Sequence, residues 1–229
     1  MGPKERDDEK EMSDKAPILY SFRRCPFAIR ARATLHACGV VCELREVSLK
    51  AKPPELLEAS PKGTVPVLIT PAGRVIEESL EVMDWALSKG DPLGWGRHWS
   101  SETARAVIER NDSYFKHHLD RAKYGDRYPG EDPAEHRRLA NAFLFELEEM
   151  LARGPGIVRG EFGAVDVACL PFVRQFANSD KEAFAALELP RVKEWLAAFL
   201  DSELFARVMV KHRPWSEGDP VVWSEAAST

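Results

Sequence analysis

Two different hydrophobic patterns divide the chain near residue 90. Before that point, short runs rich in β-branched and aromatic residues predict strands at 18–22, 41–49, 64–70 and 74–77. Apolar spacing or a proline start predicts helices at 26–38, 51–59 and 79–89. The order βαβαββα over residues 16–90 predicts an α/β domain in which helices cover a mixed sheet.

Beyond residue 90 the pattern predicts helices alone. Residues 91–100 begin with Asp-Pro-Leu-Gly-Trp-Gly, which indicates a linker. We expect an all-helical domain over residues 101–213, with helices at 101–119, 133–153, 163–178, 190–200 and 203–210. Residues 214–229 are expected to form an irregular tail, and the highly charged residues 1–15 a disordered leader.

The composition narrows the class of protein. With 44% hydrophobic and 30% charged residues, the 229-residue chain has the balance of an ordinary soluble protein. A net charge of −5 implies no nucleic-acid partner, and the apolar runs are too short to span a membrane. The charged N-terminus lacks the apolar stretch of a signal peptide, and four cysteines without paired spacing favour a reducing, cytoplasmic compartment.

Cys25 is the first candidate for chemistry. It lies between the strand at 18–22 and the helix that starts at Pro26. The first-turn amides and the positive end of that helix favour a thiolate, and the two preceding residues are arginines. The alternative is a small buried hydrophobe. That alternative suits the other cysteines, Cys38, Cys42 and Cys169.

Further residues could complete a binding site. Pro66 lies inside an apolar strand, where a cis bond after Val65 would turn the Val65 backbone outward to pair with an extended peptide. An ordinary edge-strand proline is the simpler alternative. Glu78 can accept from an ammonium group, and Ser79 with the first helical amides can donate to a carboxylate, unless Ser79 is only a helix cap. Lys52 could contact a second carboxylate, although an isolated surface lysine carries no such meaning.

These segments, in this order and at these separations, resemble the N-terminal domain of a glutathione transferase. They are Cys-Pro-Phe-Ala at 25–28, Leu-Lys-Ala-Lys-Pro at 49–53, Thr-Val-Pro-Val-Leu at 64–68 and Glu-Ser at 78–79. The first two look like the cysteine-type, omega-like branch. The resemblance extends over residues 16–213 and implies a thioredoxin-like fold followed by an all-helical domain.

The resemblance also implies a glutathione site, with glutathione as co-substrate. Cys25 would face the glutathione sulfur, with Phe27 beside it. The other implied contacts are Lys52 to the glycine carboxylate, Val65 before a cis Pro66 to the cysteinyl backbone, and Glu78 and Ser79 to the γ-glutamyl end. In the helical domain, residues 163–166 occupy the place of the family's capping box, with glycine where Ser or Thr is usual. Asp166 can still reach back to the amides of the loop before the helix, so we interpret it as a structural residue.

A cysteine at this position favours a mixed disulfide with glutathione. Ala28 stands where a Cys-x-x-Cys dithiol would have its second cysteine, so a second glutathione would resolve the intermediate. We expect a glutathione transferase of the thioltransferase type, acting in thiol transfer, deglutathionylation or dehydroascorbate reduction. Two alternatives stay open: a transferase that conjugates or isomerises a small electrophile, and a non-enzymatic interaction protein with the same fold.

The second substrate is expected between the domains, where Tyr114, Phe115 and His118 could form a wall. Packing within the helical domain is the commoner role for such residues. The adjacent His117 and His118 do not share a helix face and make a poor metal pair, and no Cys/His cluster has zinc spacing, so no metal is expected. The resemblance implies a possible homodimer, for which the sequence indicates no surface.

Overall fold

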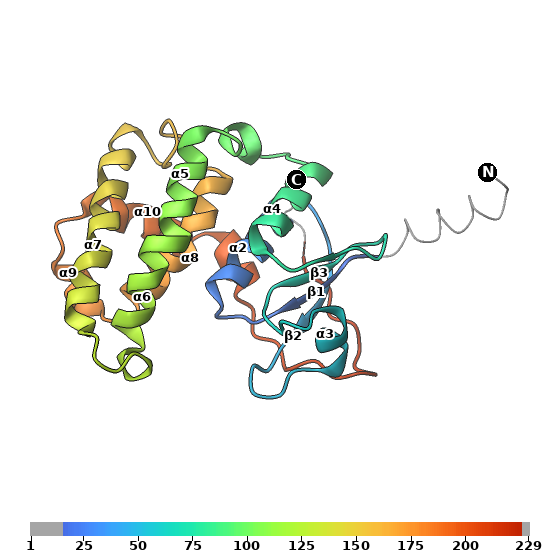
Figure 1. Cartoon of the computed structure of the whole chain (residues 1–229). Helices are drawn as coiled ribbons and strands as arrows, with labels where there is room; N and C mark the ends of the chain where they lie inside the picture. The colour runs from blue at the N-terminus through green and yellow to red at the C-terminus, as the bar shows by residue number, and fades with distance from the viewer. Residues whose placement is uncertain (1–15, 226–229) are drawn as a thin grey trace. The chain divides into compact units, whose positions relative to one another are not determined.

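A computed structural model of the protein describes residues 16–225 (Figure 1). The expected leader lies outside the described residues, as does the end of the expected tail. The chain packs into two compact units. Among the described residues, the first combines 16–93 with 203–225, and the second is Gly94–Ser202.

The first unit contains the predicted βαβαββα succession. Its elements are β1 (Ile18–Ser21), α2 (Pro26–Ala37), β2 (Glu43–Glu46), α3 (Pro54–Ala59), β3 (Val67–Ile69), β4 (Val75–Ile76) and α4 (Ser79–Lys89), to which the C-terminal segment adds α11 (Glu203–Val208). All four strands are shorter than predicted, β2 and β3 most of all. Strand β3 begins only after Pro66, which has no amide hydrogen for the ladder.

The strands form one mixed sheet in the order β2-β1-β3-β4. Strand β1 pairs parallel with β2 and antiparallel with β3, and β3 pairs antiparallel with β4. Neighbouring side chains of β1 point to opposite faces. Leu19 packs among residues of α2 and α4, while Tyr20 packs with Leu56 of α3. Helices therefore cover both faces of the sheet, which confirms the thioredoxin-like α/β fold.

The C-terminal segment packs on the first unit, whereas we expected the helical domain to continue to residue 213. Helix α11 contacts α2. Farther along, the Trp215 amide donates to the Glu46 carbonyl at 2.8 Å, and the Leu44 amide donates to the Val222 carbonyl at 2.7 Å. The expected irregular tail thus satisfies backbone groups along β2, which is an edge strand of the sheet.

The second unit is helical, as predicted. Its α-helices are α5 (Glu102–Arg110), α6 (Lys116–Lys123), α7 (Pro133–Met150), α8 (Ala164–Ala177), α9 (Lys181–Ala186) and α10 (Pro190–Leu200). A π-helical turn, η2 (Asn111–Phe115), joins α5 to α6, and short 3-10 turns occur at η1 (Trp95–His98), η3 (Gly125–Arg127) and η4 (Leu151–Arg153). The pattern did not predict α9, a helix of 6 residues that the Asp180 side chain caps.

Helix α8 forms the centre of this unit. Most of its residues are buried, and it contacts α5, α6, α9 and α10. Helices α6 and α7 lie beside each other within the unit (Figure 1). None of the helices described over residues 16–225 has the length and hydrophobicity that a bilayer-spanning segment needs.

Candidate active site

The thiol of Cys25 lies at the start of helix α2, as the sequence predicted. Cys25 is the N-cap residue in an extended conformation, and Pro26 follows at the first helical position. Its carbonyl accepts the Ile29 amide at 2.9 Å, and its side chain is partly exposed. The positive end of a helix therefore lies next to a reachable thiol, which is the environment that favours a thiolate nucleophile.

The bend before β3 lies against this thiol. The Val65–Pro66 peptide bond is cis, which confirms that prediction. The Cys25 thiol donates a hydrogen bond to the Val65 carbonyl, with 3.6 Å between sulfur and oxygen. Val65 itself is 9% exposed and belongs to the core around Tyr20. The structure thus joins two features that the sequence placed far apart.

A cavity of about 630 Å³ opens at this point of the first unit. It brings together all the residues for which a glutathione contact was predicted: Cys25, Phe27, Lys52, Val65, Pro66, Glu78 and Ser79. Leu49, Lys62, Gly63, Thr64 and Glu77 complete its lining. The shared location is a finding, while the role of each residue toward glutathione stays a prediction.

Charges of both signs line the cavity. The Lys62 ammonium lies 3.1 Å from a carboxylate oxygen of Glu78 and 3.9 Å from one of Glu77. The hydrogen bond to Glu78 is the main cause of a raised pKa for Lys62. Sequence reasoning missed Lys62 because it treated residues 60–63 only as a turn. A lysine in a turn before an apolar strand is only a weak signal of a binding site. Only the fold brings Lys62 close to Glu78.

Ser79 is the first residue of α4 and Glu78 is the N-cap, so the alternative that made Ser79 the helix cap is wrong. The Ser79 hydroxyl accepts a hydrogen bond from Nε of Arg30 at 3.0 Å. Arg30 is only 2% exposed, and its guanidinium lies 5.1 Å from the centre of the Phe27 ring. Arg30 therefore contacts both Phe27, near the start of α2, and Ser79, at the start of α4.

Arg32, which like Arg30 belongs to α2, holds the loop that leads to Cys25 through hydrogen bonds. Only 6% of it is exposed, and burial lowers its pKa to about 10, opposed by the negative charges of Glu46 and Cys25. It remains a cation at neutral pH. It donates to the carbonyls of Phe22 (3.4 Å), Arg23 (2.8 Å) and Val208 (3.0 Å) and to the hydroxyl of Ser21.

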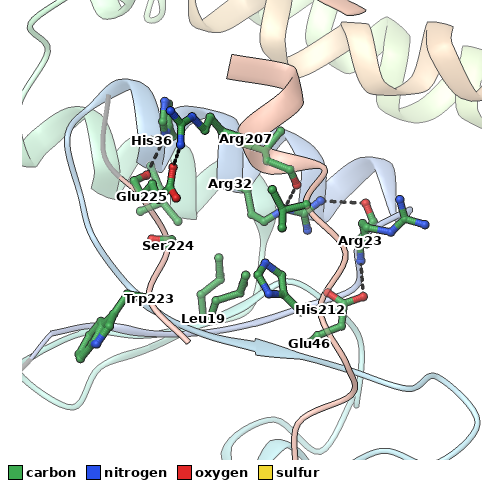
Figure 2. Close-up of a pocket in the computed structure, with 14 residues that line it drawn as sticks. Leu19, Arg23, Arg32, His36, Glu46, Arg207, His212, Trp223, Ser224 and Glu225 are labelled. Atoms are coloured by element: carbon green, nitrogen blue, oxygen red, sulfur yellow. Dashed lines mark hydrogen bonds and ion pairs between the residues drawn. The ribbon is translucent and has the colours of Figure 1, made fainter. Parts of the chain in front are cut away.

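Figure 2 shows this support beside a smaller cavity of about 70 Å³, which Arg23, Arg32, Glu46 and His212 help to line. The Arg23 amide donates to a Glu46 carboxylate oxygen at 2.8 Å. Sequence reasoning missed Arg32. The available signal was an arginine within the run of small and apolar residues at 28–35, because a charge in such a run must be either exposed or held by buried partners.

The three residues predicted for a second-substrate wall lie in the helical unit. Phe115 is a correction to that prediction, because it is fully buried. Its ring packs 4.9 Å from that of Phe143 and 5.5 Å from that of Phe176, so it is a core residue. Tyr114 and His118 are partly exposed, and their rings lie 4.5 Å apart. Their role toward a substrate stays a prediction.

Asp166 has the structural role that we inferred from the sequence. Its carboxylate accepts from the amides of Gly163 and Ile157, each at 2.9 Å, and from the Trp195 indole at 2.8 Å. It therefore ties the loop before α8 to α10.

The fold and the cysteine site together define a class of protein, a thioredoxin-like domain with a thiol at a helix start, followed by a helical unit. Comparisons with known proteins identify the family. The model for "Glutathione S-transferase, N-terminal domain" matches residues 19–92, and that for "Glutathione S-transferase, C-terminal domain" matches residues 106–198. The chain belongs to the glutathione S-transferase family.

Individual relatives agree with this assignment. Over 191 residues the chain is 42% identical to glutathione S-transferase omega-1 of Mus musculus, covering 79% of this chain and 75% of the mouse protein. A glutathione transferase family member from Pseudomonas fluorescens, solved with two glutathione molecules bound, superposes with a TM-score of 0.72 at 20% identity and covers 85% of this chain and 92% of its own. Glutathione transferase Omega 3C from Trametes versicolor superposes with a TM-score of 0.69 at 19% identity, covering 93% and 97%.

Proposed function

We propose that the protein is a glutathione-dependent thioltransferase in which Cys25 forms a mixed disulfide with glutathione. The carrying observation is that a thiol, and not a hydroxyl, lies at the start of α2 and lines the 630 Å³ cavity. The omega-1 name of the mouse relative and the bound glutathione of the Pseudomonas fluorescens structure support glutathione as the co-substrate.

The charges of the cavity match the ends of the tripeptide. Glutathione has an ammonium and a carboxylate at its γ-glutamyl end and a second carboxylate on its glycine. Glu78 would hold the ammonium in competition with Lys62, and Ser79 with the first amides of α4 would hold the neighbouring carboxylate. Lys52 would hold the glycine carboxylate. The backbone of Val65 would pair with the cysteinyl residue, as a strand pairs with an extended peptide.

The proposed reaction exchanges one disulfide for another in two steps. The Cys25 thiolate attacks the glutathione sulfur of a glutathionylated substrate, which forms the Cys25–glutathione disulfide and releases the substrate as a thiolate that takes a proton from water. A second glutathione thiolate then attacks the glutathione sulfur of this mixed disulfide. The products are glutathione disulfide and the Cys25 thiolate, so no other oxidant or reductant is needed.

The remaining cysteines support resolution by a second glutathione. Cys38, Cys42 and Cys169 are all buried. Burial raises the pKa of the Cys38 thiol to about 11 and that of the Cys42 thiol to about 12, which makes both poor nucleophiles at neutral pH. Ala28 stands where a dithiol motif would supply its second thiol.

The deciding experiment is intact-protein mass spectrometry after incubation with oxidised glutathione. We expect wild type to gain one glutathionyl group, which reduced glutathione removes, and Cys25→Ser to gain none. The Cys42→Ser variant is the matched control and should react like wild type. An adduct that persists in Cys25→Ser, or no adduct in wild type, would contradict the proposal.

The same variants separate the two alternatives from this proposal. A Cys25→Ser variant that still joins glutathione to a chlorinated aromatic acceptor at the wild-type rate would indicate a conjugating transferase. A folded wild-type protein that does not bind glutathione in calorimetry would indicate an interaction protein. The cytoplasmic location and the homodimer stay predictions.

A further inference from the structure

Three of the six histidines of the chain come together in the helical unit. His117 and His118 belong to α6, and His136 lies in the first turns of α7. One ring nitrogen from each lies within 4.8 Å of one from each of the others. From the sequence we considered only whether the adjacent His117 and His118 could bind a metal as a pair. The packing of α7 on α6 adds a third imidazole, 18 residues farther along the chain from His118.

The contacts of His136 indicate which of its nitrogens faces the other two rings. Its Nε2 lies 2.7 Å from a carboxylate oxygen of Glu131, and its Nδ1 lies 2.7 Å from Nδ1 of His118. A carboxylate accepts only, so Nε2 carries the hydrogen that is donated to Glu131. Neutral His136 therefore presents the lone pair of Nδ1 to the cluster. A histidine held by a carboxylate through its outer nitrogen is the usual arrangement of a metal ligand.

Glu131 is itself held in place. Nε of Arg121 donates to the same carboxylate oxygen at 2.6 Å, and another nitrogen of Arg121 donates to the His117 carbonyl at 3.3 Å. Arg121 also bears a positive charge close to the cluster, which opposes cation binding, but its pairing with Glu131 offsets much of that charge. The side chain of His136 is 13% exposed, so the surrounding protein restricts its ring.

The three imidazole rings lie close to one another, and His117 and His118 also contact each other directly. The ring centres of His117 and His118 lie 4.9 Å apart, and those of His118 and His136 lie 5.0 Å apart. Nitrogens around a tetrahedral Zn²⁺ lie about 3.3 Å from one another, given Zn–N bonds of about 2.0–2.1 Å. This spacing falls between the 2.7 Å that separates the Nδ1 atoms of His118 and His136 and the 4.8 Å within which all three ligand nitrogens lie.

We propose that His117, His118 and His136 bind a divalent transition-metal ion of the Zn²⁺ class, with Glu131 as the residue that orients His136. To present Nδ1, His118 moves its ring proton to Nε2, and the hydrogen bond between the two Nδ1 atoms gives way to two metal–nitrogen bonds. Three imidazoles suit Zn²⁺ and its first-row neighbours better than Mg²⁺ or Ca²⁺. Because His117 is exposed, water has access to a fourth position. The ion would link α6 to α7.

The test is a calorimetric titration of the full-length chain, prepared without a polyhistidine tag, with zinc chloride. A Cys25→Ser background removes the one thiol that is not buried. We expect one ion per chain with a dissociation constant below about 10 µM. Both His136→Gln and the exposed His117→Gln should weaken binding at least tenfold, and Glu131→Gln should weaken it by about 10- to 100-fold. His212→Gln, outside the cluster, is the matched control and should bind as the parent does.

Two further readouts do not depend on enzyme activity. Zn²⁺ should raise the melting temperature of the parent and of His212→Gln but not that of His136→Gln, because only the folded cluster gathers the ligands. Co²⁺ should give visible absorption bands of a tetrahedral site that are lost in the cluster variants, whose folding circular dichroism checks. Zinc binding that is unchanged in His117→Gln and His136→Gln would overturn the proposal, and so would the absence of saturable binding in the parent.

Discussion

The sulfur of Cys25 lies 3.6 Å from the carbonyl oxygen of Val65, a residue 40 positions later in the chain. This contact joins the start of α2 to the bend before β3, the two points at which a thiol and an extended peptide would meet. The thiol donates to this carbonyl. As a thiolate or in a disulfide, Cys25 has no hydrogen to donate, and the Val65 carbonyl can then accept from the backbone of a bound peptide. On the proposed function, loss of the thiol hydrogen and pairing with the peptide therefore support each other.

Glu78→Gln should weaken the binding of reduced glutathione by about tenfold, because a neutral amide replaces the charged acceptor for the ammonium. The measurement is isothermal calorimetry at low and high salt, and the loss should shrink at high salt because the site is exposed. Glu81→Gln, on an exposed position of the same helix, is the control and should leave the affinity unchanged. Equal affinities for wild type and Glu78→Gln would show that the γ-glutamyl end binds elsewhere.

Arg32→Met should lower the free energy of unfolding by about 2–4 kcal/mol, because the Ser21 hydroxyl and three carbonyls lose a buried donor. Urea denaturation measures this change. Arg24→Met, on the exposed part of the same loop, should change stability by less than about 0.5 kcal/mol. If the two variants unfold at the same urea concentration, Arg32 does not support the loop.

The features predicted from the sequence are those that short segments encode. A helix start is predicted from the pair Cys25-Pro26, and a bend from the pair Val65-Pro66. Both are found as predicted. The missed features join distant segments. Arg32 reaches the Val208 carbonyl across 176 residues. No local pattern marks such a pairing, because its partner is a backbone carbonyl, a group that every residue carries.

The spacing of residues along one helix also fails to predict a cluster that two helices form together. The rings of the adjacent His117 and His118 lie 4.9 Å apart on α6, and the packing of α7 brings His136 to both. Phe115 shows the reverse case. Its aromatic side chain was compatible with a pocket wall, but the π-helical turn that contains it places the ring toward Phe143 and Phe176. Sequence alone does not reveal which side of such a turn is buried.

Phe115→Ala should destabilise the protein by about 3–5 kcal/mol, since a fully buried ring between two others leaves a cavity when it is removed. Phe145→Ala is the matched control. Phe145 is 46% exposed on α7, so its loss should cost less than about 1 kcal/mol. Chemical denaturation of the two variants measures the difference. A Phe115→Ala protein as stable as the control would mean that this ring is not part of the core.

The stability of the helical unit should depend on pH through Asp166. Burial raises the pKa of this carboxyl to about 6, above the value of 3.8 in an unfolded chain, even though three hydrogen bonds favour the charged form. The folded state therefore holds a proton between about pH 4 and pH 6 that the unfolded state has released. This contribution to stability is fully present below pH 4 and is lost as the pH rises through 6, by about 3 kcal/mol in total.

Asp166→Asn isolates this effect. The variant should be less stable than wild type at every pH, because an amide cannot accept from all three donors, and the difference should grow as the pH falls from 7 to 4. Urea denaturation at several pH values measures it. A difference that is constant, or that shrinks toward pH 4, would show that burial does not raise this pKa.

Gly163→Ser restores the hydroxyl that the family's capping box usually has, yet we expect it to destabilise the protein. A side-chain carbon at residue 163 would lie 2.9 Å from the Trp95 carbonyl oxygen, closer than real contacts allow. The backbone there is extended, so the obstacle is this neighbour and not the conformation of the glycine. Asp166 already accepts from the Gly163 amide, and a serine could add only the second half of the box.

The two opposing contributions to the Gly163→Ser effect can be separated. The clash should cost about 1–3 kcal/mol, and the new cap should return about 1 kcal/mol of it. Gly163→Ala introduces the same carbon without the hydroxyl, so it should be less stable than Gly163→Ser by the value of the cap. Thermal and urea unfolding of both variants test this order. If Gly163→Ser proves more stable than wild type, then the Trp95 backbone yields easily, and close packing is not the reason that glycine stands at this cap.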